Sequence, residues 1–191
     1  MFKLLAAALI ALLVSPCVFA NWQLVNDQSD VSFVSTKKSR VSEAHHFKSL
    51  NGTIDDKGNI SISIALSSVE TNIAIRNDRM KSMLFEIIKY PEANIKASID
   101  PERINKMRAG DTYTDNISIK LSLHGFTKKI NGNIKIIKLT NNRVMATSIS
   151  PIIINADKFK LADGIEKLRK AAKLPSISTA VPVVFNFVFS K

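Results

Sequence analysis

Hydrophobic residues alternate with polar ones along most of this chain, and this period of two constrains the fold more than any other feature. In residues 59–66, Asn-Ile-Ser-Ile-Ser-Ile-Ala-Leu, every second side chain is a large aliphatic one. The same alternation recurs in residues 116–123 and, with valines and phenylalanines, in residues 181–189. Residues 144–154 predict a further single strand, although their alternation is less regular. Successive side chains of a β-strand point to opposite faces of its sheet, so each run predicts a strand with one buried face.

Strands with one buried face have two stable arrangements, a sandwich of two packed sheets and a single sheet closed into a barrel. Turn sequences at residues 56–59, 124–125 and 141–142 separate the alternating runs, which together predict about eight antiparallel strands. A barrel of that size encloses side chains or one slender ligand. The inward positions here are isoleucine, leucine, valine and phenylalanine almost throughout, so we expect an apolar interior.

Residues 76–91 interrupt this alternation, because their apolar side chains lie three and four positions apart. The side chains at this spacing are Met80, Met83, Leu84, Ile87 and Ile88. That spacing predicts one amphipathic helix, and the proline at its end predicts where it stops. An amphipathic helix in a β protein has to cover apolar surface, and flexible methionines fill irregular apolar space well. We therefore hypothesise that this helix is a lid on an apolar tunnel. Its side chains that would contact the ligand or the mouth of the barrel are Met80, Met83, Leu84 and Ile87.

A shorter helical pattern follows in residues 162–174, where Ile165, Leu168 and Ala172 share one face. This second helix would close or line another part of the opening. Ordinary packing of both helices against the core is the competing interpretation, because it requires the same spacing of apolar residues.

The start of the chain has the pattern of a secretory signal peptide. A basic residue precedes an apolar run over residues 4–14, and small side chains precede the expected cleavage point. We expect residues 1–20 to be removed and residues 21–191 to fold as a single exported domain. Cys17 is the only cysteine of the chain, so we expect no disulfide and no cysteine chemistry in the mature domain.

The chain carries a formal net charge of +11, yet its pattern does not fit nucleic-acid binding. Its lysines stand singly at alternating strand positions, without the interleaved aromatic residues on which single-stranded nucleic acid stacks. A solvated basic surface accounts for this charge. Attraction to an anionic membrane surface, or to the anionic head group of a ligand, is the functional alternative.

No catalytic or metal-binding motif stands out in the sequence. Its three histidines are His45 and His46, which as neighbours on a strand point to opposite faces, and His124 in a turn. No phosphate-binding loop or nucleophile motif occurs among the six glycines. A hydrolase or isomerase would need a polar cluster inside the barrel, and the inward-facing residues offer none. We therefore expect no enzyme, no metal site and no cofactor.

A series of short motifs runs through the middle of the chain. They are Gly52 with Gly58, Ser-Val-Glu-Thr at residues 68–71, Arg-Asn-Asp-Arg at residues 76–79, Phe85 with Tyr90-Pro91, and Leu-His-Gly-Phe-Thr-Lys at residues 123–128. In their order and spacing these motifs resemble the YceI-like family of exported bacterial proteins. The resemblance covers nearly all of the chain after residue 20 and is loose only from residue 157 on.

This resemblance implies a lipocalin-like antiparallel barrel with a helix over it. Some YceI-like proteins hold a long isoprenoid lipid inside the barrel, and many are periplasmic and without known catalysis. We therefore expect a periplasmic, non-catalytic protein that holds an isoprenoid, quinone-like or fatty chain. The competing expectation is a structural or adaptor module whose barrel is filled by its own side chains, above all Phe185, Phe187 and Phe189. The oligomeric state is left open, a homodimer included.

The candidate ligand contacts are inward-facing strand residues together with the apolar face of the predicted lid. They are Phe33, Ile62, Ile64, Leu66, Met80, Met83, Leu84, Ile87, Ile119, Leu121, Ile134, Phe185 and Phe187. Arg76 and Arg79 begin the helix, where their charge opposes the helix dipole, so we expect another purpose for them. They would form a rim for an anionic head group; ion pairs with Asp78, Glu70 or Glu86 are the alternative.

Overall fold

The computed structural model describes residues 21–191, so the predicted signal peptide lies outside the described residues. Within that range, no helix is long and apolar enough to span a membrane. The strands are β1 (Trp22–Leu24), β2 (Asp30–Lys37), β3 (Val41–Phe47), β4 (Leu50–Ile54), β5 (Asn59–Ala65), β6 (Val69–Glu70), β7 (Glu92–Ser98), β8 (Thr112–Leu123), β9 (Phe126–Thr140), β10 (Arg143–Ser148), β11 (Ile152–Asn155) and β12 (Ala180–Ser190). The helices are α1 (Ala74–Arg79), α2 (Pro101–Lys106) and α3 (Ala162–Ala171), with a π-helical turn at Met80–Leu84 and 3-10 turns at Asn26–Gln28, Leu66–Ser68 and Ala156–Phe159.

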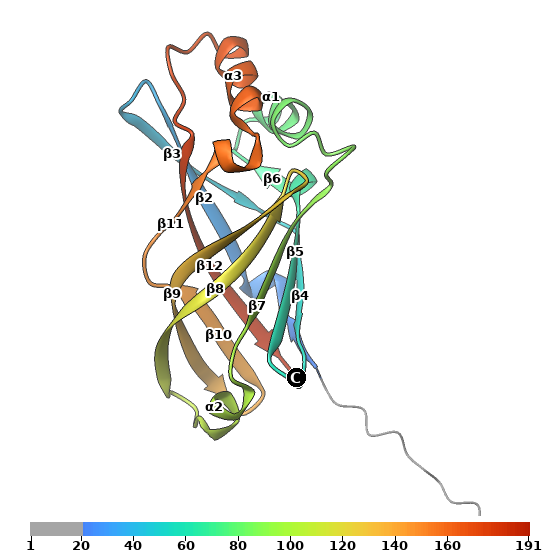
Figure 1. The fold of residues 1–191 in the computed structure, drawn as a ribbon, viewed down its shortest axis with the longest axis vertical. Coiled ribbons are helices and arrows are strands. Elements are labelled where there is room, and N and C mark those ends of the chain that lie inside the picture. Colours follow the sequence, from blue (N-terminus) through green and yellow to red (C-terminus); the bar gives the residue numbers. More distant parts are fainter. Residues whose placement is uncertain (1–20) are drawn as a thin grey trace, which may run out of the picture.

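Eight of these strands close into an antiparallel barrel. In the order β1-β4-β5-β7-β8-β9-β10-β12 each strand pairs with the next, and β12 pairs back with β1. The closing contact joins Leu24 of β1 to Phe189 of β12. The predicted mainly β barrel of about eight strands, with a covering helix and a second short helix, is therefore confirmed (Figure 1).

The other strands extend the barrel wall beyond this ring, because β12 changes its partners along its length. Phe189 pairs with β1 and β10, whereas Val183 pairs with Phe33 of β2 and with Ile152 of β11. Strands β3 and β6 then continue the sheet from β2. In Figure 1 this extension leads to the end that carries α1 and α3, called the upper end below, and α2 lies at the opposite, lower end.

The single strand predicted over residues 144–154 is in fact two strands. β10 runs beside β9 and ends at Ser148, and β11 begins at Ile152 on another stretch of β12. Pro151 lies between them, and it has no N–H group to donate to a ladder. The prediction of one strand is therefore wrong.

The helix predicted over residues 76–91 ends well before its proline. α1 passes directly into the π-helical turn, and we call these two elements, residues 74–84, the lid segment. In the wider turn the Phe85 N–H donates to the carbonyl oxygen of Met80, five residues earlier, over 2.9 Å. Glu86 then has a left-handed φ of 47°, which ends helical geometry. Ile88, predicted on the apolar face, is consequently 100% exposed.

Side chains fill the barrel at its lower end. Phe189 and Trp22 are only 1% and 6% exposed where β12 meets β1. α2 covers this end and buries Ile104. Its start is capped by Asp100, whose carboxylate accepts a hydrogen bond from the Glu102 N–H over 2.9 Å. The lower half of the barrel is therefore largely a packed core, and a smaller cavity of about 210 Å³ remains at its rim, between α2 and the turn that joins β4 to β5.

Gly58 forms the turn between β4 and β5, and we expect its replacement to be costly. Its φ is +79°, and a Cβ there would lie 2.1 Å from the carbonyl oxygen of Ile99. Gly58→Ala should lower the free energy of unfolding by more than about 2 kcal/mol in a denaturant titration. Gly110→Ala is the matched control, because its φ is +92° but a Cβ there meets nothing within 4 Å. Equal losses for the two variants would contradict a role for the contact with Ile99.

Candidate functional site

A cavity of about 310 Å³ occupies the upper half of the barrel, beneath the lid segment and α3. Its wall consists mainly of aliphatic and phenylalanine side chains from the strands. Of the residues predicted to contact a ligand, the wall contains Phe33, Ile64, Leu66, Met80, Leu84, Ile119, Leu121, Phe185 and Phe187, together with both arginines of the predicted rim, Arg76 and Arg79. The structure brings these residues together, and their contact with a ligand stays a prediction.

Four of the predicted ligand contacts lie outside the cavity wall. Ile62 and Ile134 are buried, but further towards the packed lower half of the barrel. Met83, within the lid segment, and Ile87, just after it, are half-buried. Met83 and Ile87 do not reach the cavity wall because the apolar face predicted for a regular α-helix does not continue through a π-helical turn.

The lid segment and α3 pack directly on each other and cover the cavity together. Gly164 of α3 permits this approach, since a Cβ there would lie 2.8 Å from the carbonyl oxygen of Met83 and 2.9 Å from Cα of Leu84. Arg79 Nη1 donates to the carbonyl oxygen of Ala171 at the end of α3, over 3.4 Å. The apolar face that the sequence predicts for this second helix also lines the cavity, through Ile165, Leu168 and Ala172.

Phenylalanines of β12 mark the boundary between the cavity and the packed core. The rings of Phe185 and Phe187 stack with centroids 4.5 Å apart, and both line the cavity. Phe189, two residues further on, is 1% exposed and lies outside the cavity wall. The barrel is thus filled by its own side chains in one half and hollow in the other.

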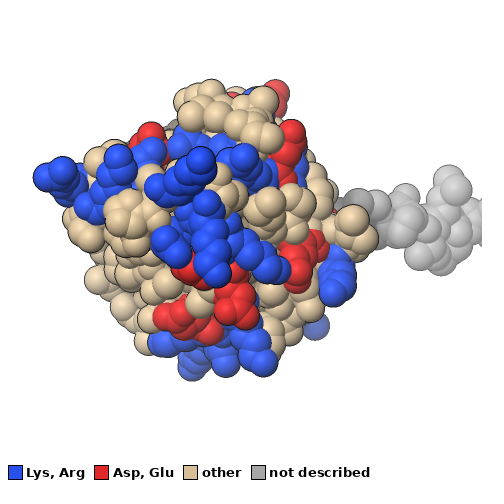
Figure 2. Space-filling model, turned by 90° about the horizontal axis from the view of Figure 1, so that it is seen from above, with Lys and Arg blue, Asp and Glu red and all other residues tan. Residues whose placement is uncertain are grey.

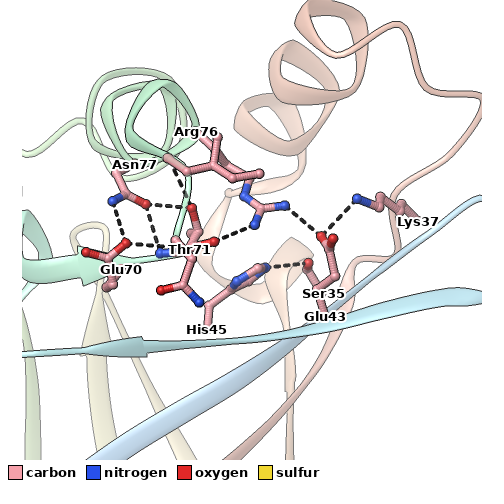
Figure 3. Close-up of polar contacts among 10 residues, drawn as sticks. Ser35, Lys37, Glu43, His45, Glu70, Thr71, Arg76 and Asn77 are labelled. Atoms are coloured by element: carbon pink, nitrogen blue, oxygen red, sulfur yellow. Dashed lines mark hydrogen bonds and ion pairs between the residues drawn. The ribbon is translucent and has the colours of Figure 1, made fainter.

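Polar side chains line the cavity on the side of the β2–β3 turn. They are Ser35, Lys37, Glu43, His45 and Arg76, which we call the polar cluster (Figure 3). Of these residues only Arg76 was predicted; the other four were not, because the inward-facing strand residues were expected to be apolar. The sequence did contain a signal for them. The inward-facing residues of β2 and of β3, taken at every second position, change from apolar to polar towards the turn that joins the two strands.

Two cations share one carboxylate in the polar cluster. Glu43 Oε2 lies 2.6 Å from Arg76 Nη1 and 2.9 Å from Lys37 Nζ. Arg76 Nη2 also donates to the carbonyl oxygen of Thr71 over 2.6 Å. Arg76 therefore pairs with a residue of β3 and not with any of the nearby acidic residues that the sequence suggested. The ion pair connects the lid segment to the barrel wall (Figure 3).

Asn77 fastens the lid segment to β6. Its Oδ1 accepts hydrogen bonds from the N–H and the hydroxyl group of Thr71, over 2.9 and 2.6 Å. Its Nδ2 donates to Glu70 Oε1 over 2.9 Å, and Glu70 also pairs with Lys48 at 2.6 Å. Because Asn77 is buried, these bonds are shielded from water and specify where the lid segment sits.

His45 is the most buried member of the polar cluster, only 3% exposed. Its Nε2 lies 2.8 Å from the hydroxyl oxygen of Ser35, and its ring meets the edge of Phe33. Burial lowers the pKa of His45, and the positive charge of Arg76 lowers it further. Within the described residues, His45 Nδ1 and Arg76 Nε have no hydrogen-bond partner. The polar cluster thus retains hydrogen-bonding capacity that the protein itself does not use.

His124 holds the chain that follows the lid segment. Its Nε2 lies 3.1 Å from Glu86 Oε2, its Nδ1 lies 3.2 Å from the carbonyl oxygen of Phe159, and its ring packs on Tyr90. Both partner atoms are acceptors, so both ring nitrogens donate only when the ring is protonated. His124 thereby joins the turn between β8 and β9 to Glu86, just after the lid segment, and to the 3-10 turn that ends at Phe159. Across residues 21–191, no three His, Cys, Asp or Glu side chains are grouped so that they could hold a metal ion.

Two carboxylates at the upper end have lowered pKa values, from which we expect the protein to lose stability in acid. The hydrogen bond from Lys37, and next to it the pairing with Arg76, lower the pKa of Glu43. Hydrogen bonds from Lys48 and then Asn77 lower the pKa of Glu70 from its usual 4.5 to about 2. The folded protein therefore binds fewer protons than the unfolded chain. Stabilisation that is present above about pH 4.5 is lost as the pH falls towards 2.

Thermal unfolding between neutral pH and pH 2 checks this expectation. The midpoint should fall steeply in acid for the wild-type protein. Glu70→Gln should unfold at a lower temperature near neutral pH and show a shallower acid dependence. Glu102→Gln, in the exposed α2 at the lower end, should follow the wild type. An acid dependence that is the same in Glu70→Gln and the wild type would contradict the assignment.

Comparisons with known proteins agree with the fold. The family profile of the YceI-like domain matches residues 22–189. A polyisoprenoid-binding domain from Saccharophagus degradans, implicated in plant cell wall breakdown, superposes with a TM-score of 0.87 at 36% identity, covering 88% of this chain and 97% of that domain. Burkholderia cenocepacia BcnA shares the fold with a TM-score of 0.64 at 19% identity, covering 86% of this chain and 98% of that protein. No match was found among curated proteins.

Proposed function

Because this chain belongs to the YceI-like family, we propose that it is a non-catalytic protein that holds a long apolar lipid chain in its barrel. The cavity of about 310 Å³ with its apolar wall carries this proposal. Small-molecule sites have volumes of about 300–1,000 Å³. The Saccharophagus degradans domain is described as polyisoprenoid-binding, which supports an isoprenoid chain, and quinone-like and fatty chains share its chemistry.

Burial of the lipid chain would supply the affinity. Each CH₂ group removed from water contributes about 0.8 kcal/mol, so about twelve carbons contribute about 10 kcal/mol before the cost of ordering the ligand. Polar contacts are then needed only to orient a head group. This mode of binding requires no catalytic residue.

The head group would lie beside Arg76 and Arg79. Arg76 is already bonded to Glu43, whereas the contact of Arg79 with the carbonyl oxygen of Ala171 is long, at 3.4 Å. Arg79 is therefore the arginine with more freedom to turn towards an anionic group. With export directed by residues 1–20, the protein would meet its ligand in the periplasm.

Native mass spectrometry of the protein expressed with its own leader tests this function. We expect a mass that exceeds the mass of residues 21–191 by one lipid molecule, which organic extraction then identifies. The same spectrum reports whether residues 1–20 have been removed. A protein that is empty, and that takes up neither a polyisoprenol nor a fatty acid when these are added, would favour the adaptor module instead.

A further inference from the structure

Exposed apolar side chains gather at the upper end of the molecule. Ile88 is 100% exposed, Ile75 is 58% exposed, and Ile73 and Val41 are 47% and 38% exposed. They belong to three separate projections, the loop after the lid segment, the start of α1 and the β2–β3 hairpin. Single exposed isoleucines are common on proteins, but several at one end indicate a contact surface. Because they stand on projections and do not line a groove, they suit a broad, flat partner.

Basic side chains lie among these apolar ones. Figure 2, which views the molecule from above, shows Lys and Arg side chains gathered across the upper end. Acidic side chains are fewer there, and Glu166 of α3 is already paired with Arg169 at 2.7 Å. The exposed basic residues of the elements at this end include Lys38, Arg40, Lys89, Lys167, Lys170 and Lys173.

The cavity reaches the protein surface at this same end. Glu43 and Lys37 line it, and their side chains are 35% and 26% exposed. Arg76 of α1 and the exposed Ala172 after α3 also line it, so these exposed or partly exposed lining residues lie on β2, β3, α1 and the end of α3. A chain that leaves the cavity there emerges among exposed isoleucines and lysines.

We propose that the upper end docks on an anionic phospholipid bilayer. Ile75 and Ile88 enter the boundary between head groups and acyl chains, and the surrounding lysines contact the lipid phosphates. This combination of apolar projections and basic charge favours a bilayer over an acidic protein, which would need a matching set of apolar pockets. This inference rests on the proposed function, because docking serves a lipid carrier that exchanges its ligand with a membrane. The docking itself can be measured whether or not the protein carries lipid.

Sedimentation of residues 21–191 with vesicles tests the docking. We expect binding to phosphatidylcholine vesicles that contain phosphatidylglycerol, little binding to pure phosphatidylcholine, and weaker binding as salt is added. The double variants Ile75→Ser with Ile88→Ser, and Lys89→Glu with Lys167→Glu, should each bind at least about tenfold more weakly. Unchanged circular dichroism and thermal unfolding would show that both variants are folded.

The chain offers a matched control for each variant. Ile149→Ser with Ile153→Ser likewise removes two exposed isoleucines, which are 52% and 56% exposed between β10 and β11 and on β11. Lys57→Glu with Lys106→Glu makes the same change of charge at the lower end, in the turn between β4 and β5 and at the end of α2. Both controls should bind vesicles as the wild type does. Equal loss in the lysine controls would mean that only the overall charge of the protein matters, and this would overturn the proposal.

Two further outcomes would also overturn it. Full binding by the isoleucine variant would reduce the docking to electrostatic adsorption, and binding that ignores phosphatidylglycerol would remove the role of the lysines. The lipid content of every variant, measured by native mass spectrometry, keeps the two proposals apart. A wild-type protein that docks but never carries lipid contradicts the proposed function alone, and a lipid-loaded protein that does not dock contradicts this inference alone.

Discussion

Replacing Ala93 by phenylalanine should abolish retention of lipid while the protein stays folded. Ala93 lies on β7, is buried, and lines the cavity beside its strand partner Ile64. The added ring of Ala93→Phe would occupy a large part of a cavity of about 310 Å³. Because the ring enters a hollow and not a packed core, the cost in free energy of unfolding should stay at or below the about 1–3 kcal/mol typical of overpacking. Lipid extracted per mole of protein is the measurement.

The control for this substitution is Asn94→Phe, one residue further along the same strand. Asn94 is exposed and points to the other face of β7, so the same ring would lie outside the barrel. This variant should retain as much lipid as the wild type. A folded Ala93→Phe protein that still carries one lipid per molecule would place the ligand elsewhere and contradict the proposed function.

Gly164→Ala should loosen the cover of the cavity, although alanine normally stabilises a helix by about 1 kcal/mol relative to glycine. The new Cβ would lie 2.8 Å from the Met83 carbonyl oxygen and 2.9 Å from Cα of Leu84. Both atoms belong to the backbone and cannot rotate away, so α3 and the lid segment have to separate. We expect a loss of about 1–3 kcal/mol in the free energy of unfolding. Lipid should pass to acceptor vesicles at least about tenfold faster, as a destabilisation of about 1.4 kcal/mol implies.

Asp163→Ala tests the same helix without the contact, because Asp163 is exposed at its first turn. Its effect on unfolding should stay within about 1 kcal/mol, and its rate of lipid transfer should match the wild type. A Gly164→Ala protein that is more stable than the wild type, with unchanged transfer, would show that the two covering elements are not tightly packed.

The barrel is predictable because its signal is local. Alternation within runs such as residues 59–66 assigns each side chain to one face of a strand, whatever the strand pairs with. The amphipathic spacing that starts at Arg76 and the face of Ile165 and Leu168 likewise identify the two covering helices. The end of the first helix was misplaced, since the π-helical turn and the left-handed Glu86 depend on hydrogen bonds that hydrophobic spacing does not report.

The polar cluster could be predicted from the sequence only in part. Ser35, Lys37, Glu43 and His45 continue the inward phase of β2 and β3, and the alternation contains that information. The inward positions were taken to be apolar almost throughout, so the polar end of each series was overlooked. The partner of Arg76 was not predictable in the same way, because Glu43 lies 33 residues away and on another element.

The sequence by itself determined a mainly β chain, the inward face of each strand, the two helices that need an apolar surface, and the motifs of the family. Only the tertiary structure decided that the barrel is filled at one end and hollow at the other. Ile62 and Ile64 belong to the same alternating face, yet only Ile64 lines the cavity. The physical reason is that alternation says which face a side chain takes, whereas a cavity depends on which side chains meet across the barrel, and those come from strands far apart in the chain.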